Sequence, residues 1–320
     1  MRESSCQLPE TQIRSLKGKR ISIVGYGSQG RAQALNLRDS GFTPTIGVRS
    51  GRSRDLAQGD GFLTTSIAEA VSRADIVMLL VPDEVHAEVC REHVITNMAK
   101  GARLGFACGL TVHFKLVSLP PDCAFFLVAP KGPGELLRKR YLEGDGIPAL
   151  VAASDTESLD VAKGYAHAIG CGRAGIVETT FREEAVADLF GEQCVLAGGL
   201  IELMKAAFRV LTERGYSPEV AYIECIAEVE YMASLMNRVG LKDLGRYISS
   251  TAYFGGKTRG KRLIGEGVAR EMRAILEEIE SGAFLNDFKA YLEKPEPGVR
   301  DKVVEGIEKA RKNLAQGFER

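Results

Sequence analysis

The sequence predicts an α/β domain over residues 1–180 followed by an all-α domain over residues 181–320. Two observations support this division. Up to about "IPALVAAS", short apolar strands alternate with helical segments, which is typical of a sheet built from successive βα units. After Thr180 the strand patterns stop, and the 3.6-residue period of amphipathic helices continues to about Leu314.

The bulk composition excludes several classes of protein. Of 320 residues, 45% are hydrophobic and 26% are charged, which is typical of a soluble globular chain. Lys plus Arg equals Asp plus Glu at 42 each, so we expect neither nucleic acid nor a membrane surface as a partner. We find neither a signal peptide nor a run of about 18 apolar residues, and the seven cysteines show no CxxC pairing. We therefore expect a cytoplasmic protein with reduced thiols.

A glycine-rich turn follows the first predicted strand. In "KRISIVGYGSQGRAQALNL", the apolar segment Ile21–Val24 leads into Gly25, Gly27 and Gly30, and a helical pattern follows. This is G-x-G-x-x-G between a strand and a helix, where glycines admit a pyrophosphate and the helix N-terminus supplies amide donors. The alternative interpretation is an ordinary glycine-rich βα turn. We predict a Rossmann domain that binds a dinucleotide.

The end of the second predicted strand indicates which dinucleotide. NAD-binding domains place an acid there to hold the ribose 2′-hydroxyl, but "TPTIGVRS" ends in Arg49 and is followed by Arg52, Ser53 and Arg54. Guanidinium and hydroxyl donors favour a 2′-phosphate. The alternative is a solvated basic loop. We predict NADP(H).

Further strands are predicted in "ADIVMLLVPDEV", "ARLGFACG", "CAFFLVAP" and "IPALVAAS". Ligands of such sheets bind beyond the carboxyl ends of the strands, so residues 83–86, Cys108 and Lys131 are expected near the nicotinamide. The predicted cofactor-binding residues are Gly25, Tyr26, Gly27, Ser28, Gln29, Gly30, Arg49, Arg52, Ser53, Arg54, Asp83, Glu84, Val85, His86 and Gly134.

Two pairs of acids lie inside apolar helical segments of the second half. Asp188 and Glu192 are four residues apart in "ADLFGEQCV", and Glu224 and Glu228 are four apart in "AYIECIAEVE". Residues at this spacing share one face of a helix. Either pair alone is most often an exposed helix face, and this is the alternative interpretation of Glu230. Both pairs together predict a hard divalent cation, Mg²⁺, because no His or Cys is placed to favour zinc.

The motifs together resemble one known family. Over most of its length the chain resembles the short-form ketol-acid reductoisomerases (acetohydroxyacid isomeroreductases) of branched-chain amino acid biosynthesis. The resemblance covers "LKGKRISIVGYGSQG" to about "LEEIESGAF" and includes "LLVPDEVHAEV", "VAPKGPG", "RAGIVETTFREE", "DLFGEQ", "GGLIELMKA", "YIECIAE" and "ISSTAYFG". It implies a Rossmann domain joined to a knotted all-helical domain, and a homodimer or larger homo-oligomer with active sites between subunits.

The resemblance also implies site residues. It makes Asp188 and Glu192 magnesium ligands and adds Glu224 and Glu228 from the neighbouring subunit, with Glu228 also catalytic. Ser249 in "ISSTA" matches the serine that binds the substrate carboxylate. The implied reaction is a metal-assisted alkyl shift in a 2-acetolactate-type 2-hydroxy-3-keto acid, followed by hydride transfer from NADPH to give a 2,3-dihydroxy acid. Lys131 would supply positive charge or a proton relay, although a lysine at a strand end is often only a solvated cap.

The sequence departs from the family pattern around the substrate. Where the family has "FAHG" with a catalytic histidine, this chain has "GFACGL", so Cys108 takes the catalytic position. Arg31, Gln33 and Glu135 replace other common histidines, and Tyr253 replaces an acid. A thiol does not match imidazole as a near-neutral acid or base. Three functions therefore stay open: a reductoisomerase, a divergent paralogue that reduces or isomerises another small keto acid, and a non-catalytic NADP-binding protein.

Overall fold

The computed structural model describes residues 10–294 and 301–318. The chain divides into two compact units between Ala185 and Val186. Unit 1 is the α/β part, and the regular structure in the described residues of unit 2 is helical, which confirms the fold class that the sequence predicts. Within the described ranges, no helix is long and apolar enough to cross a membrane.

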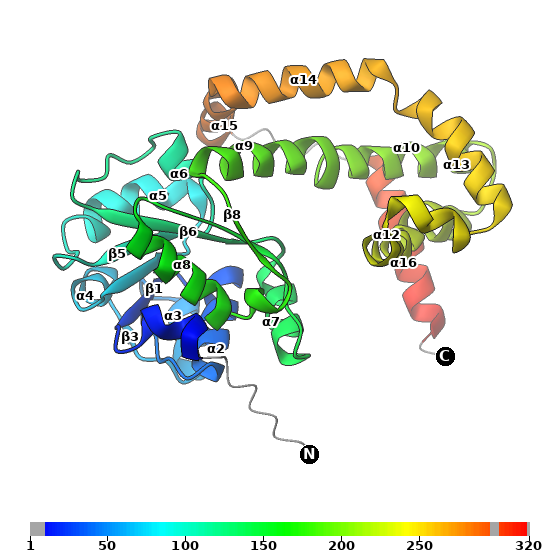
Figure 1. The fold of residues 1–320 in the computed structure, drawn as a ribbon. Helices are drawn as coiled ribbons and strands as arrows, with labels where there is room; N and C mark the ends of the chain where they lie inside the picture. The colour runs from blue at the N-terminus through cyan, green and yellow to red at the C-terminus, as the bar shows by residue number, and fades with distance from the viewer. Residues whose placement is uncertain (1–9, 295–300, 319–320) are drawn as a thin grey trace. The chain divides into compact units, whose positions relative to one another are not determined.

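Unit 1 is built on one eight-stranded sheet with the order β3-β2-β1-β4-β5-β6-β7-β8 (Figure 1). The first six positions in this order reproduce the Rossmann arrangement. The strands are β1 Ile21–Val24, β2 Thr45–Gly47, β3 Thr64–Thr65, β4 Ile76–Leu79, β5 Arg103–Phe106, β6 Ala124–Pro130, β7 Ala149–Ala153 and β8 Ile176–Glu178.

Strand β7 runs in the opposite direction to its neighbour β6. Strands β1 to β6 are parallel, but β7 is antiparallel to β6, with Pro130 opposite Ala149. The sequence pattern predicts this strand but not its direction. The intervening helix, α7, packs against α2, and the chain re-enters the sheet beside the end of β6. Strands β3 and β8 were not predicted, because two or three partly exposed residues carry too little pattern.

Helices cover both faces of the sheet. One face, marked by Ile21 and Ile23 of β1, packs against α2, α7 and α8. The other face, marked by Val24, packs against α4, α5 and the π-helical turn η2. This alternation follows from the period of two in a strand. The helical elements are α1 Glu10–Ile13, η1 Arg14–Leu16, α2 Ser28–Asp39, α3 Arg52–Gly59, α4 Ile67–Ser72, α5 Asp83–Val89, η2 Cys90–Val94, α6 Leu110–His113, α7 Gly134–Leu142, α8 Thr156–Ala168 and η3 Cys171–Arg173.

Helix α9, Phe181–Gly191, contains the boundary between the units, and helical segments make up the described remainder of unit 2. Its π-helical turns are η4 Glu192–Leu196 and η5 Ile223–Ala227, and η6 Leu244–Arg246 is a 3-10 turn. The helices are α10 Gly199–Glu213, α11 Pro218–Tyr222, α12 Glu228–Asp243, α13 Ser250–Leu263, α14 Glu266–Ser281, α15 Ala283–Glu293 and α16 Lys302–Phe318.

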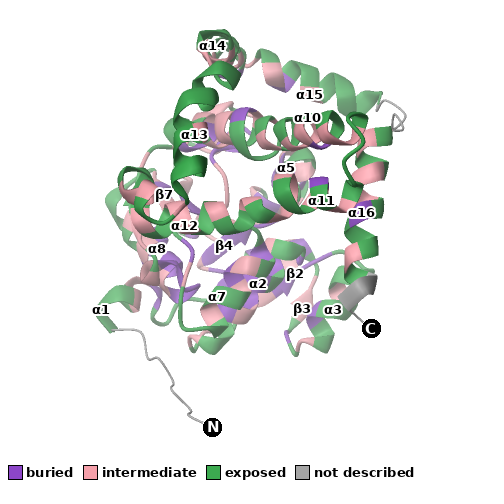
Figure 2. Ribbon diagram, turned by 90° about the vertical axis from the view of Figure 1, so that its right-hand side faces the viewer, coloured by how far each residue is buried: buried purple, intermediate pink, exposed green. Residues whose placement is uncertain are grey.

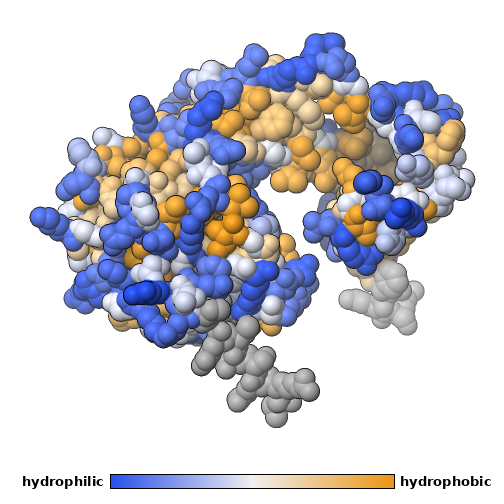
Figure 3. Space-filling view, viewed as in Figure 1, coloured by the Kyte–Doolittle hydropathy of each residue, from blue (hydrophilic) through white to orange (hydrophobic). Residues whose placement is uncertain are grey.

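Few large apolar side chains are buried among the described residues of unit 2. One buried cluster, where α10, α11 and α16 meet, contains Phe208, Ala221 and Ala310. In Figure 2 the buried colour is concentrated on the strands and α2, whereas α13 and α14 are mostly exposed. Figure 3 shows apolar side chains on the surface along α9 and α10. The exposed large apolar residues of unit 2 include Val195, Leu196, Ile201, Leu203, Val210, Tyr231, Leu241, Tyr247, Phe254 and Leu263.

Candidate functional site

The three glycines of the first turn meet three different spatial demands. Gly25 has φ +98°, and a Cβ there would lie 2.5 Å from the carbonyl oxygen of Leu80. A Cβ on Gly30 would lie 2.4 Å from the carbonyl oxygen of Gly25, so this glycine lets α2 pack against the turn. A Cβ on Gly27 would meet nothing within 4 Å. The space beside Gly27 is therefore open to a ligand at the N-terminus of α2, as a pyrophosphate requires.

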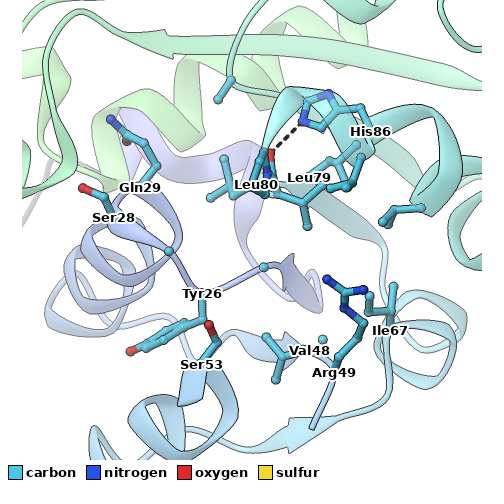
Figure 4. Close-up of a pocket in the computed structure, with 18 of the residues that line it drawn as sticks. Tyr26, Ser28, Gln29, Val48, Arg49, Ser53, Ile67, Leu79, Leu80 and His86 are labelled. Carbon is cyan, nitrogen blue, oxygen red and sulfur yellow. Dashed lines mark hydrogen bonds between the residues drawn. The ribbon is translucent and has the colours of Figure 1, made fainter. Parts of the chain in front are cut away.

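A cleft of about 670 Å³ opens at this turn, beyond the carboxyl ends of β1, β2 and β4. Figure 4 shows Ser28 and Gln29 on one side, Arg49 and Ser53 on another, and His86 across from them. Most of the predicted cofactor residues line it: Gly25, Tyr26, Gly27, Ser28, Gln29, Arg49, Arg52, Ser53, Asp83, Val85 and His86. The others do not belong to its lining: Gly30, Arg54, Glu84 and Gly134.

The β2 side of the cleft is basic. Arg49 and Arg52 line it together with Ser50 and Ser53, and both arginines are exposed. Among the described residues that line the cleft, the one acid is Asp83, which follows β4. The loop after β2 therefore offers donors to an anion.

Tyr26 is fixed at the edge of this loop by an ion pair. Its hydroxyl donates to Oδ2 of Asp60 at 2.9 Å, and Nε of Arg31 donates to the same oxygen at 2.7 Å. The guanidinium of Arg31 holds the pKa of the Asp60 carboxyl below its usual range, while burial raises the pKa of Tyr26. Arg31 therefore acts as a structural partner of Asp60.

His86 lies buried at the β4 side of the cleft and is neutral. Burial lowers its pKa. Nε2 lies 2.9 Å from the carbonyl oxygen of Val81 and therefore carries the proton (Figure 4). Nδ1 then accepts from the Thr111 hydroxyl at 2.8 Å. The ring is thus locked by two protein contacts.

Cys108 follows β5 and lines the same cleft. Its Sγ donates to Oδ1 of Asp83 at 3.4 Å. Burial, with the nearby charges of Asp83 and Glu184, raises the pKa of the Cys108 thiol well above its ordinary value. The group is therefore a neutral thiol near pH 7.

Glu184 is a residue that sequence reasoning missed. Oε1 accepts from Nζ of Lys131 at 2.7 Å, and Oε2 accepts from the Gly109 N–H at 2.5 Å. The Glu184 side chain is fully buried, while that of Lys131 is 30% exposed. A buried carboxylate requires such partners. The available signal was a third acid in the apolar segment, four residues before Asp188.

Three of the four predicted metal ligands lie in or directly after π-helical turns. Asp188 lies near the end of α9, Glu192 begins η4, Glu224 lies within η5 and Glu228 begins α12. Asp188 is partly buried and the other three are exposed. In the part of the chain that the structure describes, no three His, Cys, Asp or Glu side chains gather to hold a metal ion. π-helical turns are rare in proteins, and those that occur are frequently found at functional sites.

Ser249 caps the N-terminus of α13. Its Oγ accepts from the Ala252 N–H at 3.1 Å and lies 3.0 Å from the hydroxyl oxygen of Thr251. The residue is exposed. Its hydroxyl therefore lies where the amide groups of the helix end are also presented.

Comparisons with known proteins match both parts of this arrangement. Residues 15–175 match the family model of the acetohydroxy acid isomeroreductase NADPH-binding domain, and residues 181–316 match the ketol-acid reductoisomerase C-terminal domain. The chain belongs to the ketol-acid reductoisomerase family. It is an NAD(P)-dependent reductoisomerase, as the sequence resemblance predicts.

Solved structures agree with this assignment. An NADH-preferring ketol-acid reductoisomerase from an uncultured archean is 36% identical, with a TM-score of 0.89 over 97% of this chain and 96% of that chain. A semialdehyde dehydrogenase NAD-binding protein from Cupriavidus necator is 18% identical, with a TM-score of 0.62 over 82% of this chain and 99% of that chain. A pyrroline-5-carboxylate reductase from Coxiella burnetii is 15% identical, with a TM-score of 0.59 over 82% and 98%. The last two show a shared fold alone.

Proposed function

We propose that this reductoisomerase converts 2-acetolactate-type 2-hydroxy-3-keto acids to 2,3-dihydroxy acids with NADPH and Mg²⁺, in branched-chain amino acid biosynthesis. The observation that carries the proposal is the single cleft that begins at the basic β2 loop and ends at Asp83 and Cys108. Beyond β5, the Lys131–Glu184 pair is bonded to the Gly109 backbone next to Cys108. When bound, Mg²⁺ polarises the ketone and acidifies the hydroxyl of the substrate, and NADPH supplies hydride.

The residues of this chain would divide the work as follows. Arg49, Arg52 and Ser53 would hold the 2′-phosphate, and the amides at the start of α2 would hold the pyrophosphate. Lys131 would stabilise negative charge on substrate oxygens, because Glu184 fixes its ammonium. The Ser249 hydroxyl would donate to the substrate carboxylate. Cys108 would be an uncharged part of the cleft lining, and its thiol would hold the Asp83 carboxylate in place by a hydrogen bond.

Preference for NADPH is part of this proposal. The matching family model is described as NADPH-binding, whereas the 36% identical archaeal relative prefers NADH. The proposed preference for NADPH therefore rests on the loop after β2 of this chain. It presents two arginines and two serines to the cleft and no acid.

The metal assignment fits the donor chemistry. Asp188, Glu192, Glu224 and Glu228 offer only oxygen, as Mg²⁺ prefers. The described residues of one chain contain no cluster of three metal-binding side chains, which agrees with a site that a second subunit completes. The exposed apolar side chains of unit 2 offer a surface for that subunit. We therefore propose a homodimer or larger homo-oligomer with active sites between subunits.

A second candidate function rests on Cys108. A neutral thiol in contact with Asp83 replaces the imidazole that the family pattern contains, so the chain is also a candidate reductase or isomerase of a different small keto acid. The test is turnover of 2-acetolactate and of a panel of 2-keto acids with NADPH and Mg²⁺. Turnover of 2-acetolactate above that of every 2-keto acid supports the first function. Absence of 2-acetolactate turnover, with reduction of one panel member, supports the second.

The Cys108→His variant sharpens the same test. In a reductoisomerase that has only drifted at this position, the imidazole restores or preserves turnover of 2-acetolactate. In an enzyme reshaped for another substrate, the variant leaves 2-acetolactate inert and impairs the true reaction. A chain that turns over no keto acid but binds NADPH is a non-catalytic binding protein.

A further inference from the structure

A chain of three side-chain hydrogen bonds connects α8, α2 and the loop after β6 in unit 1. The Tyr165 hydroxyl of α8 donates to Oε1 of Gln33 in α2 at 3.0 Å. Nε2 of Gln33 donates to Oε1 of Gln29 at 3.0 Å. Nε2 of Gln29 donates to the carbonyl oxygen of Gly132 at 2.9 Å. We call these contacts the amide relay.

The amide relay has one possible polarity. The Gly132 carbonyl only accepts, so Gln29 must present its NH₂ group to it and its oxygen to Gln33. Gln33 must then present its own NH₂ group to Gln29 and its oxygen to Tyr165, whose hydroxyl therefore donates. Gln33 and Tyr165 are completely buried, so neither has water as an alternative partner. The orientation of each side-chain amide therefore fixes the orientation of the next group in the relay.

The relay connects two loops of the proposed site. Gln29 belongs to the glycine-rich turn and lines the cofactor cleft. Gly132 follows Lys131, whose N–H donates to the carbonyl oxygen of Pro148 at 2.9 Å and whose Nζ bonds to Glu184. The two loops also touch at Gly134, where a Cβ would lie 2.2 Å from the carbonyl oxygen of Ser28. The cofactor turn and the Lys131 loop are thus held together as one piece.

We propose that Gln33 is a positioning residue that sets the presentation of Lys131 through Gln29 and Gly132. The inference rests on the proposed role of Lys131. Both polar ends of the Gln29 side chain are occupied by protein groups, so loss of Gln33 releases Gln29 and with it the Gly132 carbonyl. The backbone amides of the glycine-rich turn remain in place for the cofactor. Turnover should therefore fall more than cofactor affinity.

The main test is Gln33→Met, which keeps the shape of the side chain and removes its amide. The matched control is Asn36→Leu, because Asn36 is another completely buried amide of α2, bonded to the Ile169 carbonyl and to Arg138 but not to the relay. We expect kcat of Gln33→Met to fall about tenfold with NADPH Kd changed less than about threefold. In Asn36→Leu the melting temperature falls while kcat stays within about twofold.

A second readout does not depend on activity. Hydrogen exchange of the peptide that contains residues 130–134 should be faster in Gln33→Met than in the parent and unchanged in Asn36→Leu. The double variant Gln29→Met/Gln33→Met should have the same kcat as Gln29→Met, since members of one relay are not additive. Equal loss of kcat in Gln33→Met and Asn36→Leu, or unchanged exchange in Gln33→Met, overturns the proposal.

Tyr165→Phe is the substitute variant if Gln33→Met does not fold, because it removes only the donor at the start of the relay. In that case, unchanged hydrogen exchange of the peptide with residues 130–134 together with an unchanged kcat in Tyr165→Phe would refute the proposal. Should the parent not turn over 2-acetolactate, the proposed function fails, and the exchange measurement alone judges the relay.

Discussion

Nζ of Lys131 lies 2.7 Å from Oε1 of Glu184, a carboxylate that is completely buried. The second oxygen of Glu184 accepts from the Gly109 backbone at 2.5 Å. One side chain of α9 therefore connects the loop after β6 with the loop after β5. The contact joins three segments that are far apart in the sequence.

The first prediction concerns this contact. Glu184→Gln keeps the acceptor for Gly109 but removes the carboxylate charge that faces the Lys131 ammonium. We expect the free energy of unfolding to fall by about 3 kcal/mol, because the Lys131 ammonium loses the attraction of a fully buried carboxylate. Urea denaturation measures this. The control is Glu183→Gln, an exposed neighbour whose carboxylate accepts from Thr179. An equal, small effect of both changes would contradict the importance of the buried pair.

The second prediction concerns the cofactor. Arg49→Gln removes a positive charge from the lining of the cleft, so we expect the Kd for NADPH to rise about tenfold. The Kd for NADH should change less than about twofold, because NADH lacks the 2′-phosphate. Fluorescence titration of the reduced cofactors measures both. Arg54, which does not line the cleft, supplies the comparison variant Arg54→Gln. Tighter binding of NADH than NADPH by the parent would refute the proposed preference.

The third prediction concerns the metal. Asp188→Asn removes one charged ligand and keeps the side-chain volume, so the fold should survive. The Mg²⁺ concentration for half-maximal isomerisation should rise by about tenfold or more. Glu230→Gln, which changes an exposed acid of α12 outside the two pairs, should leave it unchanged. Unchanged Mg²⁺ dependence in Asp188→Asn would remove this residue from the metal site.

The fourth prediction concerns pH. The folded pKa of Cys108 is raised, so between the unfolded value of about 8.5 and the folded value the unfolded chain binds fewer protons. Stability from this group is fully present below about pH 8.5 and falls as pH rises above it. The loss approaches about 1.4 kcal/mol per pH unit for this one proton. Cys108→Ser should flatten the dependence of the urea midpoint on pH from 8 to 10. Identical slopes in parent and variant would contradict the raised pKa.

Much of the fold could be predicted because its signals are local. The glycine spacing and the buried strands β1, β4, β5 and β6 follow from residue patterns within short segments. The direction of β7 could not be predicted, since it depends on where α7 packs and not on the composition of the strand.

The site was predicted less completely for a similar reason. Arg49 and Asp83 were expected in the cleft because they follow strands, and they line it. Glu184 and the relay partner Tyr165 lie on helices and reach the site only through tertiary packing. An acid or a tyrosine on an amphipathic helix is usually exposed or part of a core, so its sequence carries no signal of such a contact.

The π turns at η4 and η5 have a consequence for how the acid pairs tolerate change in chain length. A π turn contains one residue more than the regular helix needs, so its removal leaves a continuous α-helix. The wide turn absorbs the extra residue, so the later residues of the helix would keep nearly the same direction about the axis. A one-residue deletion between Glu224 and Glu228 would leave the two acids three residues apart, on one face of a regular helix. The same deletion in a regular α-helix would rotate every later residue by about 100°, so the π turns are the places where these helices can lose a residue and keep their faces.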